Sequence, residues 1–158
     1  MDNDGLLLCD LQARTFELSL TKQKTSSAIF IRRFMNSDIV KIIDNRGILQ
    51  TTIQPWDLIE MIDEEYGVSD YGTVKYSSNE MYWIGYIYRY YCFTYEKSSR
   101  QAYRIIKPKE LRDLYLPYHT LDPLQAVDRI LEAKGLLLDE EGELKRQYQI
   151  FKQIRNRQ

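Results

Sequence analysis

The stretch that decides the fold is residues 81–95, MYWIGYIYRYYCFTY, which places eight aromatic residues around a single glycine, Gly85. Ser77 and Glu80 precede it with the spacing of a capping box, in which two side chains satisfy free backbone N–H groups at a helix start. The pattern therefore predicts one helix over residues 78–96, apolar on nearly every face. A helix of this kind must be buried on several sides. We expect either a central helix or the platform for a partner.

Four residues of this helix are the expected structural core: Trp83, Gly85, Tyr86 and Tyr90. A glycine inside a helix costs about 1 kcal/mol relative to alanine, so we expect a crossing helix to approach closely at Gly85. Tyrosine rings can also stack nucleobases, but Arg89 is the one basic residue in the run. We expect the Arg89 side chain to lie along the rings, with its guanidinium on a carboxylate or a ring face.

Signals for helix starts and ends recur along the whole chain. Pro55 and Pro123 suit the first position of a helix, and Gly67 and Gly135 suit the position just after a helix end. The expected helices include residues 6–20, 28–35, 38–44, 109–116, 124–134 and 143–155, and Ser99 is expected to cap a further short helix that runs through residue 106. Pro117 is expected to end the helix at 109–116, residues 48–53 to form an irregular link, and residues 139–142 to form an acidic turn. The prediction is a single all-α domain over residues 1–158. It is a compact bundle of about seven or eight mostly short helices around the aromatic helix, frayed at 1–5 and 156–158.

Composition argues against several classes of function. Lys and Arg number 22 against 23 Asp and Glu, and this balance gives no reason to expect nucleic acid as a partner. Cys9 and Cys92 stand in no metal or redox spacing, which indicates two reduced, buried thiols. With one histidine and no glycine-rich phosphate loop, no metal and no cofactor are expected.

The N-terminus lacks the basic start of a signal peptide, and no apolar stretch reaches the ~18 residues of a membrane span. We therefore expect a cytoplasmic protein without membrane contact. The basic residues near the C-terminus are expected to be a solvated helix face, with a contact arm for an acidic partner or nucleic acid as the alternative: Lys145, Arg146, Lys152, Arg155 and Arg157.

The segment 107–123 is the densest in polar residues. Six residues separate Arg112 from His119, and this spacing resembles the signature of HEPN ribonucleases, all-α domains in which an arginine and a histidine assist RNA cleavage. That motif lies on one helix, which Pro117 is expected to interrupt. The alternative is that Arg112 pairs with a carboxylate, such as Glu110 or Asp113, while His119 caps the turn before Asp122.

Three stretches resemble one family of small bacterial proteins common in gut Firmicutes: FIRRFMNS at 30–37, the WxGYxYRY core at 83–90, and LPYHTLDP at 116–123. The resemblance extends over about residues 11–133. Genes of that family lie in loci of toxin–antitoxin or defence type. The resemblance implies an antitoxin-like partner that binds and restrains a toxin or effector encoded nearby, and it supplies no catalytic residue.

Tyrosine and arginine are usual anchors of protein interfaces, and the chain has 13 tyrosines. The expected partner-binding residues are Tyr71, Tyr76, Tyr115, Tyr118 and His119, with Arg32 and Arg33 at the rim. An enzyme needs ionisable groups that converge in one pocket, and this chain offers few. A protein-interaction module is therefore the first hypothesis. A ribonuclease using Arg112 and His119 is the second, and a structural module of a larger complex is the third.

Overall fold

Helix α5 (Ser78–Thr94) is the aromatic helix, and it begins where its capping box predicts. The Ser77 hydroxyl accepts a hydrogen bond from the Glu80 backbone N–H at 3.1 Å, and the Glu80 carboxylate accepts one from the Ser77 N–H at 2.9 Å. Two N–H groups that the helix cannot satisfy internally are thus paired. The predicted helix is confirmed, ending two residues earlier than expected.

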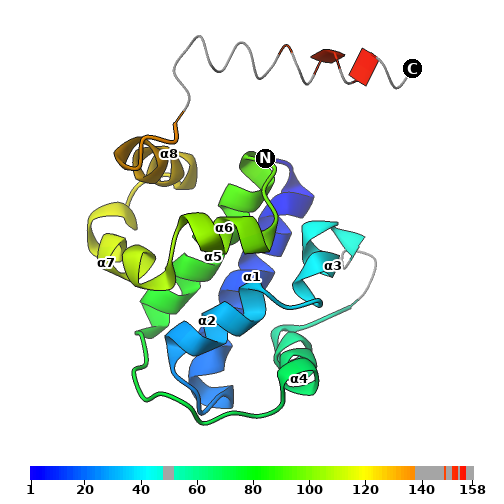
Figure 1. The fold of residues 1–158 in the computed structure, drawn as a ribbon, viewed down its shortest axis with the longest axis vertical. Coiled ribbons are helices and arrows are strands. Elements are labelled where there is room, and N and C mark those ends of the chain that lie inside the picture. The colour runs from blue at the N-terminus through cyan, green and yellow to red at the C-terminus, as the bar shows by residue number, and fades with distance from the viewer. Residues whose placement is uncertain (48–51, 138–147, 149–150, 153, 156–158) are drawn as a thin grey trace.

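The computed structural model describes residues 1–47, 52–137, 148, 151–152 and 154–155. Within residues 1–47 and 52–137 all regular structure is helical, which confirms the predicted all-α bundle. Figure 1 shows α5 at the middle of the bundle, with α7 and α8 on one side of it and α3 and α4 on the other. The other helices are α1 (Asn3–Lys22), α2 (Ser27–Met35), α3 (Val40–Asp44), α4 (Pro55–Tyr66), α6 (Ser99–Ile105), α7 (Pro108–Tyr118) and α8 (Pro123–Ala133).

Gly85 marks the closest approach between α1 and α5. A Cβ atom at this position would lie 3.0 Å from the Ala13 Cα atom, 3.0 Å from the Gln12 carbonyl oxygen and 2.9 Å from the Phe16 ring. The Gln12 side-chain amide also donates to the Gly85 carbonyl at 3.0 Å. The expected close crossing at Gly85 is confirmed, and α1 is the helix that crosses there.

The core lies where α1, α2 and α5 meet. The Phe16 ring packs edge-on against Phe30 and Phe34, with ring centroids 5.7 and 5.1 Å apart. From α5 the core receives Ile84 and Tyr88, both buried. Arg89 is buried as well, and its contacts are described with the functional site.

Several helix boundaries differ from prediction by a few residues, and three of these differences have a clear physical cause. Helix α1 begins at Asn3, because the Asp2 carboxylate accepts the Gly5 N–H at 2.7 Å and so caps it. Helix α6 is capped by Ser98 and not by Ser99, since the Ser98 hydroxyl accepts from the Gln101 N–H at 3.2 Å.

The third difference is in α7, where the expectation that Pro117 ends the helix is wrong. The helix runs through Pro117 to Tyr118, and the His119 N–H donates to the Tyr115 carbonyl at 2.9 Å. A proline removes its own N–H donor, but in the last turn the following residue still closes the helix.

Some predictions fall on residues outside the described ones. These are residues 48–51 of the expected link, the acidic turn at 139–142, the fraying at 156–158 and most of the helix expected at 143–155. The described residues of that last segment, Tyr148, Phe151, Lys152, Ile154 and Arg155, are helical and exposed. Among the described helices, none is long and apolar enough to cross a membrane.

Candidate partner-binding surface

One side of α5 carries a row of stacked tyrosines, Tyr82, Tyr86 and Tyr90, which we call the tyrosine ladder. Their ring centroids are 6.3 Å apart at each step, with interplanar angles of 24° and 18°. Residues four apart lie over one another on a helix, so the sequence spacing alone produces this stack. All three rings are half-buried.

The aromatic surface continues from α5 onto α7. The Trp83 ring meets Tyr115 edge-on at 5.9 Å, and the Tyr115 ring stacks on His119 at 4.3 Å. The His119 Nδ1 atom lies 2.8 Å from the Tyr115 carbonyl oxygen, so the imidazole also caps the end of α7. Leu116 lies beside these residues in the sequence and is 77% exposed. We call the tyrosine ladder together with Trp83, Tyr115 and His119 the aromatic face.

The opposite side of α5 is buried, through Ile84, Tyr88 and Tyr91. One side of α5 therefore belongs to the core, and the other side presents half-buried aromatic rings. Trp83, Tyr86 and Tyr90 were expected to be largely buried as part of a structural core, and they are half-buried. The reason is that α1 covers the side of α5 that carries Gly85, about a quarter turn or more from these three rings.

One carboxylate bonds directly to the tyrosine ladder, and two others lie near enough to its Tyr90 end to act on that ring through their charge. Asp10 of α1 accepts a hydrogen bond from the Tyr82 hydroxyl at 2.6 Å, and burial together with this bond raises the pKa of Tyr82 to about 12. Asp128 of α8 accepts one from the Tyr95 hydroxyl at the end of α5. Asp122 caps α8 by accepting from the Leu124 N–H at 3.0 Å.

Arg112 is held between α7 and the start of α5. Its Nε atom lies 3.3 Å from a Glu80 carboxylate oxygen, and its guanidinium lies over the Tyr76 ring, 4.4 Å from the centroid. The alternative that Arg112 pairs with a carboxylate is thus confirmed, with Glu80 as the partner. Tyr76 is buried under this arginine, and its backbone N–H donates to the Ser27 hydroxyl at 3.0 Å. The expectation that Tyr76 is an exposed anchor is therefore wrong.

The remaining predicted partner residues lie on other parts of the surface. Tyr71 is 74% exposed in the loop before α5, where its carbonyl accepts the Thr25 hydroxyl at 2.6 Å. Arg33 is half-buried, stacks on the Tyr66 ring at 5.2 Å and donates to the Gly67 carbonyl at 2.8 Å.

Exposed Arg32 lines a depression of about 380 Å³ together with Arg33, Asn36 and Tyr66. Tyr118 is half-buried against the core. Of the predicted residues, ring contacts place only Tyr115 and His119 in the aromatic face.

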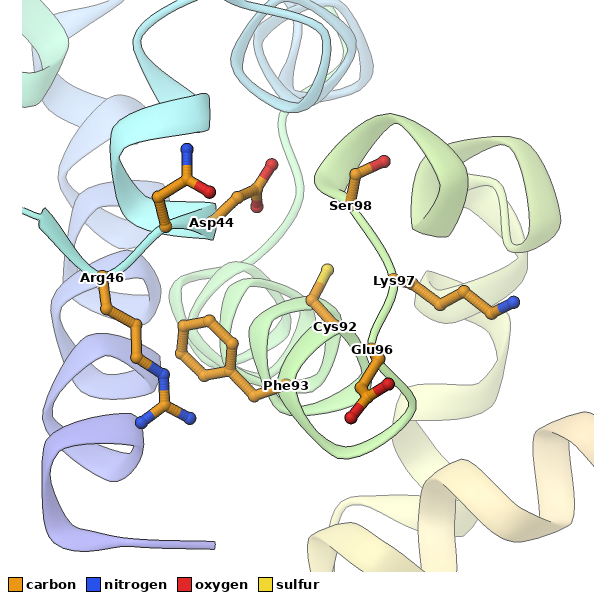
Figure 2. Close-up of a pocket in the computed structure, with 8 residues that line it drawn as sticks. Asp44, Arg46, Cys92, Phe93, Glu96, Lys97 and Ser98 are labelled. Carbon is orange, nitrogen blue, oxygen red and sulfur yellow. The ribbon is translucent and has the colours of Figure 1, made fainter. Parts of the chain in front are cut away.

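A second depression, of about 440 Å³, lies between α3 and the end of α5 (Figure 2). Cys92 and Phe93 line it from α5, and Asp44 faces them from α3, whereas Lys97 points away from the other lining residues. Burial raises the pKa of the Cys92 thiol to about 11. A neutral thiol is a poor nucleophile, so this depression is not arranged for cysteine chemistry.

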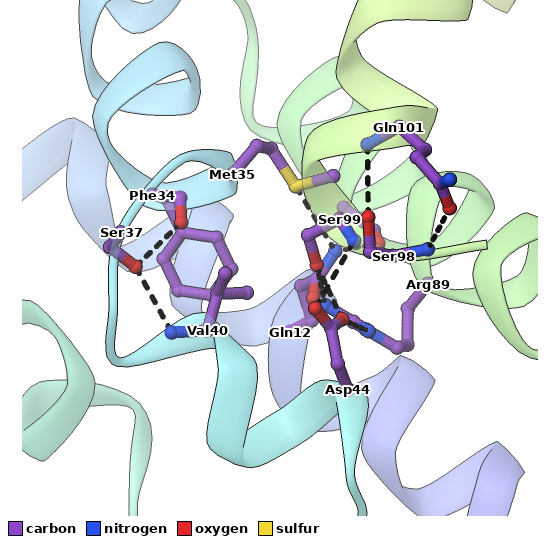
Figure 3. Close-up of polar contacts among 11 residues, drawn as sticks. Gln12, Phe34, Met35, Ser37, Val40, Asp44, Arg89, Ser98, Ser99 and Gln101 are labelled. Atoms are coloured by element: carbon purple, nitrogen blue, oxygen red, sulfur yellow. Dashed lines mark hydrogen bonds and ion pairs between the residues drawn. The ribbon is translucent and has the colours of Figure 1, made fainter.

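The charged groups beneath this depression are paired with one another (Figure 3). The Arg89 guanidinium donates to Gln12 at 2.8 Å, to Asp44 at 2.5 Å and to Ser99 at 2.6 Å. It also lies 5.3 Å from the centroid of the Phe93 ring, so the guanidinium contacts both a carboxylate and a ring, which were expected as alternatives. Because these groups satisfy one another, the cluster holds helices together and leaves no charge free for a ligand.

Trp56 is an exposed aromatic residue that sequence reasoning missed. It is 53% exposed and lines an apolar depression of about 480 Å³ with Leu18, Leu20 and Pro55. The sequence did carry a signal for the exposure of Trp56, because this residue lies outside the apolar stripe that Leu58 and Ile62 form on α4. A large apolar residue outside that stripe is expected to face solvent.

Comparisons with protein-family models, with curated proteins and with solved structures gave no match. Among the residues that the structure describes, no three His, Cys, Asp or Glu side chains group so that they could hold a metal ion.

Proposed function

We propose that this protein is a non-enzymatic interaction module that binds and restrains a toxin or effector encoded nearby, as an antitoxin does. The observation that carries the proposal is the aromatic face, in which Trp83, Tyr115 and His119 pack against one another beside exposed Leu116. Trp and Tyr dominate the energetics of protein interfaces. Rings already fixed by stacking lose little conformational entropy when a partner covers them.

The state of the ionisable groups favours binding over catalysis. Arg112 is engaged with Glu80 and Tyr76, and Arg89 with Asp44. The Cys92 thiol is kept neutral by burial, which raises its pKa to about 11. These groups serve the packing of helices, whereas the aromatic side chains on α5 and α7 remain accessible.

The test is co-expression with the product of the adjacent gene, followed by size-exclusion chromatography and a growth assay. We expect one complex at micromolar concentration and rescue of growth. Leu116→Asp should abolish both, because it places a charge beside the rings. Val68→Asp is the matched control, since Val68 is 80% exposed in the loop after α4 and should leave the complex intact. Separate elution together with no rescue would overturn the proposal.

The ribonuclease remains the second candidate because α7 is continuous through Pro117. Arg112 and the C-cap residue His119 therefore stand about two turns, or about 10.5 Å, apart along one helix. If this activity is present, expression of the chain alone should arrest growth, and His119→Ala should relieve the arrest with the fold preserved. Under the interaction proposal, the chain alone causes no arrest and His119→Ala changes nothing that depends on RNA cleavage.

A further inference from the structure

The tyrosine ladder is an aromatic surface on which no cation from the described residues lies. In the described part of the chain five cation–π contacts occur, and none of them involves Tyr82, Tyr86 or Tyr90. The Tyr86 and Tyr90 hydroxyls likewise have no hydrogen-bond partner among the described residues. The faces of these rings are electron-rich, and they attract a guanidinium or ammonium group.

Two of the three carboxylates near the ladder, Asp122 and Asp128, have no cationic partner among the described residues, whereas the third, Asp10, pairs with Arg14 at 3.2 Å. Burial raises the pKa of Tyr90, and the charges of Asp122 and Asp128 raise it further. The unpaired negative charge near the rings therefore comes from Asp122 and Asp128, at the Tyr90 end of the ladder.

We propose that this site takes a basic segment of the partner protein, with an arginine or lysine side chain lying over Tyr86 and Tyr90 and paired with Asp122 and Asp128. The proposal rests on the proposed function and names the chemistry of the partner. Aromatic rings next to unpaired carboxylates are complementary to a cation in two ways, through the ring quadrupole and through charge. A phosphate or an acidic segment would be repelled by the same carboxylates.

Arginine fits the site better than lysine. Its guanidinium is planar, stacks on aromatic rings and offers two parallel donors to a carboxylate. Asp122 is exposed and Asp128 is half-exposed. We therefore expect binding to weaken as added salt screens the charges of these two carboxylates.

The experiment measures fluorescence anisotropy of the full chain with a labelled peptide of alternating arginine and alanine. The matched probe carries citrulline, a neutral isostere, in place of each arginine. The variant Asp122→Asn with Asp128→Asn removes both charges, while the amide oxygens can still accept from the Leu124 N–H and the Tyr95 hydroxyl. Glu64→Gln on α4 is the control, because Glu64 is exposed and away from α5 and α8.

We expect the arginine peptide to bind and the citrulline peptide to bind at least about tenfold more weakly. The double variant should lose about tenfold in affinity for the arginine peptide, and Glu64→Gln should not. Tyr90→Phe should keep binding and Tyr90→Leu should lose it, since the ring is required and the hydroxyl is not. Equal binding of the two peptides, or an unchanged double variant, would overturn the proposal.

Two further outcomes separate this inference from others. Tighter peptide binding after Lys152→Gln with Arg155→Gln would show that the chain's own basic segment fills the site, which would overturn the assignment to a partner. A complex with the neighbouring protein that survives the double aspartate variant would refute this inference and leave the proposed function standing. Peptide binding without any such complex would refute the proposed function alone.

Discussion

At the scale of single residues, Arg89 is the most constrained side chain in the molecule. Its side chain is fully buried, and its guanidinium bonds to Gln12, Asp44 and Ser99, which belong to three other helices. Burying a charge is costly unless each donor is satisfied. Removing Arg89 would leave the Gln12 side-chain oxygen without its donor and the Asp44 carboxylate without its counter-charge, bonded among the described residues only to the N–H and hydroxyl of Ser99.

We therefore predict that Arg89→Met lowers the free energy of unfolding by about 3–5 kcal/mol. Methionine keeps much of the side-chain volume, so the loss reports the unpaired Asp44 carboxylate and Gln12 amide more than a cavity. Urea denaturation followed by circular dichroism measures this. Arg104→Met is the control, because Arg104 is exposed on α6 and should change stability by less than about 0.5 kcal/mol. Equal stability of the two variants would refute this account of the buried network.

At the scale of helices, the α1–α5 crossing depends on the absence of a side chain at Gly85. We predict that Gly85→Ala destabilises the protein by about 1–3 kcal/mol, although alanine is the better helix former. The added Cβ meets the Ala13 Cα atom and the Gln12 carbonyl oxygen, both backbone atoms that cannot rotate away. Gly47→Ala is the matched control, since a Cβ there finds only ordinary contacts of 3.7 Å or more with Ile42. A thermal melt of Gly85→Ala that matches the parent would contradict the close crossing.

The α5–α7 contact should make stability depend on pH through Glu80. Burial alone would raise the pKa of Glu80, but hydrogen bonds from Ser77 and the charge of Arg112 outweigh it, so this pKa lies below its usual value of 4.5. A carboxyl group with a lowered folded-state pKa stabilises the protein above its unfolded-state pKa. That contribution disappears as the pH falls through the folded-state value.

Glu80→Gln is the informative variant for this contact, because glutamine can still complete the capping box. We expect a loss of about 0.5–1 kcal/mol at pH 7. The difference between variant and parent should shrink as the pH falls below the usual carboxyl pKa of 4.5 and disappear once Glu80 in the parent is protonated. Unfolding curves from pH 7 down to the lowest pH at which the parent stays folded test this, and a difference that does not shrink would show that packing is lost and not charge.

At the scale of the whole molecule, the local signals in the sequence were enough for the fold. The capping residues Ser77 and Glu80 and the N1 prolines predicted where helices start, because each acts on its own backbone. The exposure of the aromatic residues could not be predicted in the same way. When rings occupy nearly every face of a helix, its periodicity does not indicate which face is covered.

The candidate site could not be predicted from local signals, because it is formed by contacts between residues far apart in the sequence. Because Tyr76 lies in a loop, it was expected to be exposed. Its ring is instead buried under the guanidinium of Arg112, and its backbone N–H donates to the Ser27 hydroxyl. The carboxylates around the tyrosine ladder come from α1 and α8, at opposite ends of the chain. The sequence predicted interface residue types, and packing decided which of them share one surface.

The burial of the two cysteines leads to a final prediction. Cys9 and Cys92 are buried in this pair of helices, and burial raises their thiol pKa values to about 12 and about 11. At pH 8 both thiols are therefore protonated and inaccessible, so iodoacetamide should modify neither in the native protein. Mass spectrometry should show both sites alkylated together as urea passes through the unfolding transition, because exposing both thiols requires the packed helices around them to separate.

Gly85→Ala should shift the onset of alkylation at both cysteines to lower urea by the same amount, since it destabilises the bundle in which both are buried. Gly47→Ala should leave the onset unchanged. Modification of Cys92 alone at low urea would mean that the depression between Asp44 and Phe93 opens locally, and the bundle would then not unfold as one unit. Matched onsets at the two cysteines would instead identify the α1–α5 pair as the structure on which the stability of the whole domain depends.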